Sequence, residues 1–262
     1  MSTTILITGA TDGIGLLTAT MLAAQGHKML LHGRSADKLA AAAKQVGGDA
    51  ETYLADLTRL GDVQQMADAI LEKHDTLDVL INNAGVLKAA QTTTPDGYDI
   101  RFVVNTFAPY VLTQRLLPII PKTGRVVNLS SAAQARVDLS AMAGKVRLDD
   151  MSAYAQSKLA ITIWTREVAR TMPDGPVVVA VNPGSLLASK MVEEGFGIAG
   201  NDLSIGADIL CRAALHEEFA EKSGAYFDND AGQFAQPNAA ASDPDHAAAV
   251  MQGVTRAIGT IV

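Results

Sequence analysis

"TILITGATDGIG", residues 4–15, runs from a short apolar strand pattern through three glycines into a helical pattern. Gly9 permits a tight turn, Gly13 lets the backbone approach a phosphate, and Gly15 lets the helix pack close to the strand. The helix that follows offers unpaired N–H groups and the positive end of its dipole to a pyrophosphate. The spacing Gly-x-x-x-Gly-x-Gly departs from the commoner Gly-x-Gly-x-x-Gly, but its place between strand and helix favours a dinucleotide site.

The rest of the chain repeats this alternation of strand and helix. Most strand candidates are apolar without alternation, which is typical of parallel strands covered on both faces. The pattern predicts one α/β domain, a doubly wound, seven-stranded parallel sheet with helices on both faces. The expected strands are 4–8, 28–32, 50–54, 77–81, 125–130, 177–181 and 225–227, and the expected helices are 14–25, 36–46, 60–73, 96–118, 152–171, 205–216 and 243–258.

The composition argues against several classes of function. The 262 residues carry a net charge of −7, so a nucleic-acid partner, which requires a basic surface, is not expected. Cys211 is the single cysteine and is expected to be a small buried hydrophobe in a reducing compartment. The histidines are scattered without metal-ligand spacing, so no metal is expected. No secretion signal or apolar run near the roughly 18 residues of a membrane span is present, which predicts a cytoplasmic protein without a membrane span.

Further motifs follow the glycine turn in order along almost the whole chain, although none of comparable strength lies after about residue 205. They are "ADL" at 55–57, "NNAG" at 82–85, Asn105, "NLSS" at 128–131, "YAQSK" at 154–158 and "NPG" at 182–184. Together with "TGATDGIG" they resemble the short-chain dehydrogenase/reductase family. The resemblance implies a single NAD(P)-binding Rossmann domain over residues 1–262 that interconverts a ketone or aldehyde and an alcohol.

The end of the second strand bears on the choice of cofactor. NAD-binding Rossmann proteins usually place a carboxylate there for the ribose hydroxyls, whereas this chain has Arg34 and Ser35. A guanidinium suits a 2′-phosphate, and a Gly-Arg pair here resembles NADP-preferring members, so NADP(H) is favoured over NAD(H). Two points stand against this: the alternative reading of Arg34 is a solvated loop residue, and many NADP-using members carry a basic residue where this chain has Asp12.

The resemblance assigns the other cofactor contacts. It places Asp56 at the adenine amino group, Leu57 beside it, and "NNAG" along the adenosine ribose, although "NNAG" by itself is equally a polar turn at a strand end. The cofactor-binding residues expected in full are Gly9, Thr11, Asp12, Gly13, Ile14, Gly15, Arg34, Ser35, Asp56, Leu57, Asn83, Ala84, Gly85, Tyr154, Lys158, Pro183 and Gly184.

Tyr154 and Lys158 lie four residues apart, so on a helix their side chains emerge on one face. A phenol has a reference pKa near 10, too high for a base at neutral pH. An ammonium about 4 Å away, at an effective dielectric near 20, favours the phenolate by about 4 kcal/mol, or about 3 pKa units. The pair is therefore expected to act as an acid–base device.

The resemblance completes the catalytic set as Asn105, Ser131, Tyr154 and Lys158. Ser131, rather than its neighbour Ser130, aligns with the serine that hydrogen-bonds the substrate oxygen, while Tyr154 exchanges a proton with that oxygen. Lys158 also holds the nicotinamide ribose, and Asn105 orders a water that relays protons to solvent.

Two departures from the family pattern concern the substrate. Ala188 stands where many members have a threonine that contacts the nicotinamide, with Ser189 as a candidate replacement. Ser131 and Tyr154 are 23 positions apart, a long connection that resembles retinol-dehydrogenase-like and protochlorophyllide-reductase-like members. Residues 132–151 are therefore expected to be an active-site insertion that shapes substrate access. It can also obstruct the helix face used for oligomerisation, so monomer and homo-oligomer both stay open.

Residues 185–203 are expected to be a substrate lid. Its apolar side chains favour an uncharged, fairly apolar small molecule; they are Leu186, Leu187, Met191, Val192, Phe196 and Ile198. The alternative to an enzyme is a nucleotide-sensing or scaffold protein on the same fold. Such proteins typically lose the tyrosine or the lysine, and both are present here.

Overall fold

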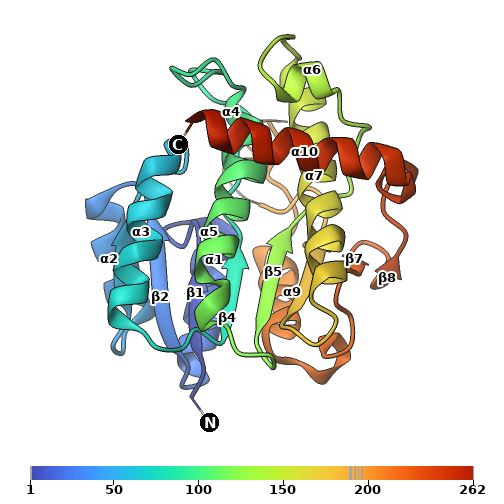
Figure 1. The fold of residues 1–262 in the computed structure, drawn as a ribbon. Helices are drawn as coiled ribbons and strands as arrows, with labels where there is room; N and C mark the ends of the chain where they lie inside the picture. The colour runs from blue at the N-terminus through green and yellow to red at the C-terminus, as the bar shows by residue number, and fades with distance from the viewer. Residues whose placement is uncertain (1, 189–190, 192, 194, 196, 262) are drawn as a thin grey trace.

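A computed structural model describes residues 2–188, 191, 193, 195 and 197–261 of the chain. Within this part, eight strands form one sheet in the order β3-β2-β1-β4-β5-β6-β7-β8 (Figure 1). Strands β1 to β7 are parallel, as predicted, and β8 is antiparallel to β7. The strands are β1 (Thr4–Ile7), β2 (Lys28–Gly33), β3 (Glu51–Leu54), β4 (Val79–Asn82), β5 (Arg125–Leu129), β6 (Val177–Asn182), β7 (Tyr226–Asp228) and β8 (Gln233–Ala235).

The doubly wound order is confirmed, because β1 pairs with β2 on one side and with β4 on the other. The chain therefore winds outward in both directions from a switch point between β1 and β4, where open α/β sheets bind ligands. The sequence pattern missed β8, which has three residues, too few to show a period.

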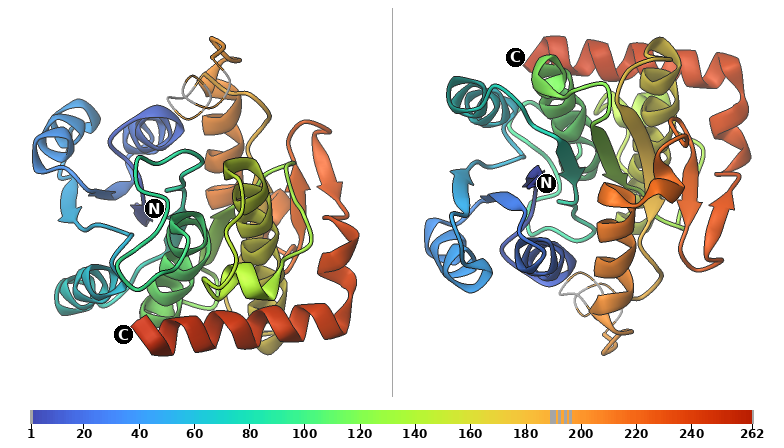
Figure 2. Two further views of the ribbon diagram at one scale, coloured as in Figure 1. Left: turned by 90° about the horizontal axis from the view of Figure 1, so that it is seen from above. Right: turned by 90° about the horizontal axis from the view of Figure 1, so that it is seen from below.

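Helices cover both faces of the sheet (Figures 1 and 2). Helices α1, α2 and α9 lie over one face, and α3, α5 and α7 lie over the other, with α10 packed across α7 and α6. The helices are α1 (Gly13–Ala24), α2 (Ala36–Val46), α3 (Leu60–Lys73), α4 (Ile100–Phe102), α5 (Ala108–Leu116), α6 (Leu139–Met142), α7 (Asp150–Thr171), α9 (Leu203–Leu215) and α10 (Pro244–Ile261).

The single helix expected over 96–118 is divided. The Asp99 side chain accepts a hydrogen bond from Arg101 N at 2.8 Å and begins α4 only at Ile100. A π-helical turn, η1 (Val103–Phe107), then separates α4 from α5. A π turn inserts one extra residue into a helix and is frequent at functional sites, and here it carries Asn105.

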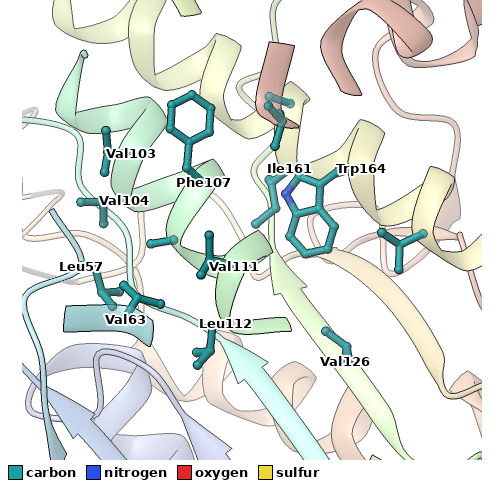
Figure 3. Close-up of a cluster of buried hydrophobic side chains, with 14 of the residues drawn as sticks. Leu57, Val63, Val103, Val104, Phe107, Val111, Leu112, Val126, Ile161 and Trp164 are labelled. Carbon is teal, nitrogen blue, oxygen red and sulfur yellow. The ribbon is translucent and has the colours of Figure 1, made fainter. Parts of the chain in front are cut away.

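The absence of alternation in the strands reflects burial on both faces. In β1, Leu6 packs into one helical layer while Ile5 and Ile7 pack into the other, and all three are inaccessible to solvent. The larger cluster contains Phe107 and Trp164, which Figure 3 shows among the side chains of that layer. Cys211 is half-buried against the other cluster, and burial raises the pKa of its thiol to about 11.

Within the described residues the structure contains neither a group of metal ligands nor a membrane-spanning helix. Across the described part of the chain, no three His, Cys, Asp or Glu side chains are grouped so as to hold a metal ion. None of the helices within that same part combines the length and the hydropathy needed to cross a lipid bilayer.

Gly15 offers a test of the strand–turn–helix packing. A Cβ there would collide with the Gly9 carbonyl oxygen and the Asn83 amide, whereas a Cβ on Gly61, an exposed helical glycine in α3, would meet nothing within 4 Å. We expect Gly15→Ala to lower the free energy of unfolding by about 2 kcal/mol through overpacking. Gly61→Ala should leave it unchanged or raise it by up to about 1 kcal/mol. Urea unfolding measures both, and equal values would contradict the close packing at Gly15.

Candidate active site

The carboxyl ends of the parallel strands bring most of the predicted residues to one edge of the sheet (Figure 2). The glycine turn follows β1, Arg34 follows β2, and Asp56 lies just beyond β3. The "NNAG" segment begins in β4, the two serines follow β5, and Pro183 follows β6. Helix α7 brings Tyr154 and Lys158 to the same edge.

The glycine turn is clamped by the end of β4. Asn83 Nδ2 donates to the carbonyl oxygens of Thr8 at 2.8 Å and Gly9 at 3.1 Å. Ala84 N donates to Thr8 Oγ1 at 3.1 Å. Gly9 and Gly13 have positive φ values of 68° and 55°, which glycine adopts without strain. The Asn83 side chain therefore holds the turn through Nδ2.

The same turn is held from β2 by His32, a residue that the sequence analysis did not select. Its Nδ1 accepts a hydrogen bond from Gly9 N at 3.1 Å, and its Nε2 lies 3.1 Å from the Ala55 carbonyl oxygen. Burial lowers the pKa of His32 to about 4, so the ring is neutral near pH 7 and Nε2 is the donor. No spacing rule signals such a histidine, because its partners come from two other strand ends.

A hollow beside β3 is lined by two of the residues expected to bind the cofactor, Arg34 and Asp56. A cavity of about 540 Å³ is lined by Arg34, Asp56 and Arg59, among other residues. Asp56 Oδ1 accepts hydrogen bonds from Thr58 N at 3.0 Å and Thr58 Oγ1 at 2.8 Å. The Arg59 guanidinium lies 3.9 Å from the Asp56 carboxylate. Two arginines thus face this hollow, one more than the sequence analysis selected.

The structure separates the two serines after β5. Ser130 is buried, and its Oγ lies 2.6 Å from Thr162 Oγ1 and 3.2 Å from the Lys158 carbonyl oxygen, so it faces the body of α7. Ser131 is half-buried, and its Oγ accepts from Ala133 N at 3.1 Å. An interaction of the Ser131 side chain with the Tyr154 phenol contributes to the pKa of that phenol. The geometry therefore favours Ser131 over Ser130 as the serine beside the tyrosine.

Tyr154 and Lys158 lie one turn apart on α7, with the ammonium 5.6 Å from the centre of the phenol ring. Lys158 is buried, and its Nζ donates to the Leu129 carbonyl oxygen at 2.7 Å. Burial lowers the pKa of Lys158 to about 8. Burial also raises the pKa of Tyr154, and the interaction with Ser131 opposes this shift without reversing it.

The expectation that Lys158 lowers the pKa of Tyr154 is therefore not met in this structure. The Coulomb argument placed the ammonium beside the phenol oxygen in a polar medium. Here the ammonium lies over the ring and is held by Leu129, and loss of hydration dominates for both groups. The phenol is consequently protonated at neutral pH.

Asn105 ties three parts of the site together. Its Nδ2 donates to the Val86 carbonyl oxygen and to Ser157 Oγ, both at 2.9 Å, and its Oδ1 accepts from Val86 N at 2.8 Å. Ser157 Oγ in turn donates to the Tyr154 carbonyl oxygen at 2.7 Å. Ser157, which the sequence analysis passed over, thus links the π turn to the first turns of α7.

Gly85 leaves space beside the lysine. A Cβ at Gly85 would lie 3.4 Å from Asn105 Oδ1, 3.5 Å from Lys158 Nζ and 3.8 Å from Met191 Cε. Within the described part of the chain, the hydrogen-bond acceptor of the Lys158 ammonium is Leu129 O. An ammonium has three N–H groups, so donors stay available for a ligand next to Gly85.

The segment after β6 carries Pro183 and Gly184 at the same edge. Leu187 is buried, whereas Leu186 is exposed and has a φ of 52°, which is rare for a residue other than glycine. Hydrogen bonds of 2.6 Å from Ala188 N to the Asn201 carbonyl oxygen, and from Asn201 N to the Leu186 carbonyl oxygen, join the two ends of the expected lid. Ser189, Val192 and Phe196, named above as contacts, lie outside the described residues.

The expected insertion, 132–151, lies along the first turns of α7. Ala135 N donates to the Ala155 carbonyl oxygen at 3.2 Å, and Asp138 N donates to Gln156 Oε1 at 2.8 Å. The Asp149 side chain accepts from Ser152 N at 2.9 Å and begins α7 at Asp150, two residues earlier than predicted. The segment thus ends in the cap of the helix that carries Tyr154.

Residues near the carboxyl end of the chain hold both the serine and the insertion. Tyr226 OH donates to the Ser131 carbonyl oxygen at 3.1 Å, and Asn238 N donates to Gln134 Oε1 at 3.0 Å. Gln134 Nε2 donates to the Ser131 carbonyl oxygen at 2.9 Å. The stretch without a motif therefore contributes to the position of the serine.

Comparison with known proteins agrees with this arrangement. A sequence profile described as short chain dehydrogenase matches residues 3–197, well over half of the chain. The chain belongs to the short-chain dehydrogenase family. This short-chain dehydrogenase is 33% identical to retinol dehydrogenase 13 of Homo sapiens over 259 residues, a match that covers 86% of this chain and 76% of the relative.

Two solved structures are similar over nearly the whole chain. An uncharacterized protein from Mycobacterium paratuberculosis is 29% identical, with a TM-score of 0.82 over 98% of this chain and 93% of that one. A short chain dehydrogenase from Burkholderia cenocepacia J2315, solved in complex with NADP, is 27% identical, with a TM-score of 0.70 over 88% of this chain and 97% of that one. The predicted family, its retinol-dehydrogenase type and the α/β fold are confirmed, and this short-chain dehydrogenase is an enzyme of an oxidoreductase family.

The neutral His32 gives this short-chain dehydrogenase a stability that depends on pH. Its pKa is about 4 in the folded protein and 6.5 ordinarily, so between these values the unfolded chain binds a proton that the folded protein excludes. The His32 contribution is complete above pH 6.5 and is lost as the pH falls from 6.5 toward 4. As the pH falls from 7 to 5, we expect the loss of the His32 contribution to lower the free energy of unfolding by about 2 kcal/mol.

Urea unfolding of wild type and His32→Asn at pH 7, 6 and 5 isolates this contribution. The asparagine oxygen can still accept from Gly9 N, but the side chain does not titrate. The variant should lose about 2 kcal/mol less than wild type over this range. His216→Asn, a change at an exposed histidine, should follow wild type, and parallel curves for all three proteins would contradict the role of His32.

Proposed function

We propose that this chain is an NADP(H)-dependent oxidoreductase that interconverts a ketone or aldehyde and an alcohol on a fairly apolar small molecule. The observation that carries the proposal is the meeting of Ser131, Tyr154 and Lys158 at the sheet edge that also holds the glycine turn. Nucleotide binding alone does not require the buried Lys158 ammonium beside the Tyr154 phenol. The alternative of a non-catalytic scaffold is therefore not favoured.

The residues present fit a nicotinamide dinucleotide. Gly15 leaves no room for a Cβ at the first turn of α1, and Gly85 lies beside Lys158 Nζ, which within the described residues donates to Leu129 O. The residues from Gly9 to Gly15 would hold the pyrophosphate, Asp56 and Leu57 the adenine, and Lys158 the nicotinamide ribose. The chemistry that such a cofactor supplies when bound is hydride transfer at the carbonyl carbon.

Tyr154 then handles the proton. Because burial keeps its pKa above the usual value, the phenol is ready to donate its proton to a carbonyl oxygen during reduction. Ser131 donates a hydrogen bond to the same oxygen, and Lys158, with a pKa of about 8, is mostly charged at pH 7. Reduction leaves Tyr154 as a phenolate, which regains a proton from solvent through an ordered water near Asn105. In the oxidative direction the phenol first loses its proton along the same path, and the phenolate then accepts the proton of the alcohol.

The preference for NADP(H) rests on Arg34 and, beside it, Arg59 at the hollow next to β3. A 2′-phosphate would find two guanidinium groups there, and guanidinium groups bind phosphate with charge-assisted hydrogen bonds. The complex of the Burkholderia cenocepacia relative with NADP supports this choice.

The preference for an apolar substrate rests on the two segments that flank the site. Met151 and Leu139 of the insertion and Leu186 of the lid are exposed apolar side chains. The likeness to retinol dehydrogenase 13, whose name gives an apolar alcohol as substrate, supports the same class. A cytoplasmic location stays a prediction from the sequence.

Substitutions at the catalytic residues test the reaction. Tyr154→Phe should lower kcat for carbonyl reduction by about 10³-fold, because the proton donor is lost while the ring packing is kept. Ser131→Ala should lower kcat by about 10²-fold, the usual effect of one donor to a developing oxyanion. Ser130→Ala is the matched control and should keep kcat within a fewfold of wild type.

The measurement is oxidation of NADPH followed by absorbance across a panel of apolar ketones and aldehydes. Dinucleotide affinity, measured by fluorescence titration, should be unchanged in Tyr154→Phe. Full turnover by Tyr154→Phe, or no turnover of any carbonyl by wild type despite tight binding, would refute the proposed reaction.

Cofactor choice is tested at Arg34. We expect Arg34→Gln to raise the KM for NADPH at least tenfold and to leave the KM for NADH within about twofold, because only NADPH carries the 2′-phosphate. Arg170→Gln is the control, since this exposed arginine pairs with Glu167 on α7. A wild-type kcat/KM tenfold higher with NADH than with NADPH would contradict the preference.

A further inference from the structure

Residues 228–230, which are the last residue of β7 and the two after it, are each bound to the end of β6 or to the segment that follows it. Asp228 Oδ1 accepts from Asn182 Nδ2 at 2.8 Å. Asn229 Nδ2 donates to the Pro183 carbonyl oxygen at 2.9 Å. Asp230 makes the largest set of contacts of the three. The turn, residues 228–230, lies in the part of the chain that carries no family motif.

Asp230 uses both carboxylate oxygens on this segment. Its Oδ1 accepts from Ser185 N at 2.7 Å, and its Oδ2 accepts from Ser185 Oγ at 2.6 Å and from Asn182 Nδ2 at 2.9 Å. Burial acts to raise the pKa of this carboxyl, but the hydrogen bonds from Ser185 and Asn182 outweigh it and lower the pKa. The carboxylate therefore accepts three hydrogen bonds in its charged form.

The segment that Asp230 holds is strained immediately afterwards. Leu186 has a φ of 52°, a left-handed conformation that is strained for a leucine. Such a residue persists only where its neighbours fix it on both sides. Asp230 fixes Ser185 before it, and Asn201 N donates to the Leu186 carbonyl oxygen at 2.6 Å after it.

We propose that Asp230 is a positioning residue that holds residues 182–186 in the conformation that receives the nicotinamide half of the cofactor. The inference rests on the proposed function and on the family resemblance, which assigns Pro183 and Gly184 to the cofactor and the nicotinamide contact to the position of Ala188, shortly after them. Asp230 acts through Ser185 and Asn182 and not by touching substrate or cofactor. The β7–β8 hairpin thereby decides how tightly the nicotinamide end is bound, while the glycine turn and Arg34 bind the other end independently of it.

The test compares Asp230→Asn with Asp245→Asn, which makes the same charge change at an exposed residue in the first turn of α10. In Asp230→Asn an NH₂ group replaces one carboxylate oxygen. Turned toward Ser185 or Asn182, this N–H donor would meet another donor and no hydrogen bond would form there. We expect Asp230→Asn to raise the Kd of NADPH and of NADH about tenfold, measured by nucleotide fluorescence. Its Kd for 2′,5′-ADP and for ADP-ribose, which lack the nicotinamide, should stay within about twofold of wild type. Asp245→Asn should match wild type with every nucleotide.

Ser185→Ala provides a second variant at an exposed side chain. It removes only the Oγ bond and should raise the Kd of NADPH about threefold, again with unchanged affinity for 2′,5′-ADP. This variant decides the question if Asp230→Asn does not fold.

Three results would overturn the proposal. The first is a Kd for NADPH within twofold of wild type in Asp230→Asn, and the second is the same result in Ser185→Ala. The third is an equal loss of affinity for NADPH and 2′,5′-ADP, which would indicate a general structural defect. A wild type that binds both dinucleotides but reduces no carbonyl refutes the proposed reaction instead, and the affinity comparison still decides the role of Asp230.

Discussion

Helices cover both faces of the central strands of the sheet, which are β1, β4, β5 and β6. Each of these strands must therefore form its backbone hydrogen bonds with its neighbours in the sheet and bury side chains on both faces. This double burial requires crossover helices, and crossover helices make the strands parallel. Because parallel strands end at the same edge, the segments that follow them meet there. The glycine turn, Ser131 and Pro183 are neighbours for this reason, although they are far apart in the chain.

The edge is then shaped by polar side chains that bind backbone rather than ligand. Asn83 and His32 hold the glycine turn from the two strands beside β1. Asn105 and Ser157 join Val86, directly after the "NNAG" segment, to α7. These bonds keep the turn and the helix in place before any cofactor is present, which is the preorganisation that a hydride-transfer site needs.

The acid–base pair shows how burial and charge compete. A lysine near a phenol favours the phenolate, whereas loss of hydration disfavours the charged form of each group. In this protein both side chains lose hydration, so the pKa of Tyr154 rises and the pKa of Lys158 falls to about 8. The local sequence shows that the two groups share a helix face, but the direction of their pKa shifts depends on what covers them. Lys158 Nζ is held at the end of β5 by Leu129 and lies next to Gly85.

The sequence by itself determined the doubly wound parallel class of the sheet, the glycine turn, the family and the four polar residues of the expected catalytic set, because all of these depend on short motifs and on local periodicity. The tertiary structure alone decided the division of the helix at Asn105, the strand β8, the roles of His32 and Ser157, and the contacts of Asp230. Each of these arises between segments that are distant in the chain, where no spacing rule operates. Ser130 and Ser131 show both contributions. Their order along the chain favoured Ser131 as the catalytic serine, whereas the direction in which each hydroxyl points depends on the packing of α7.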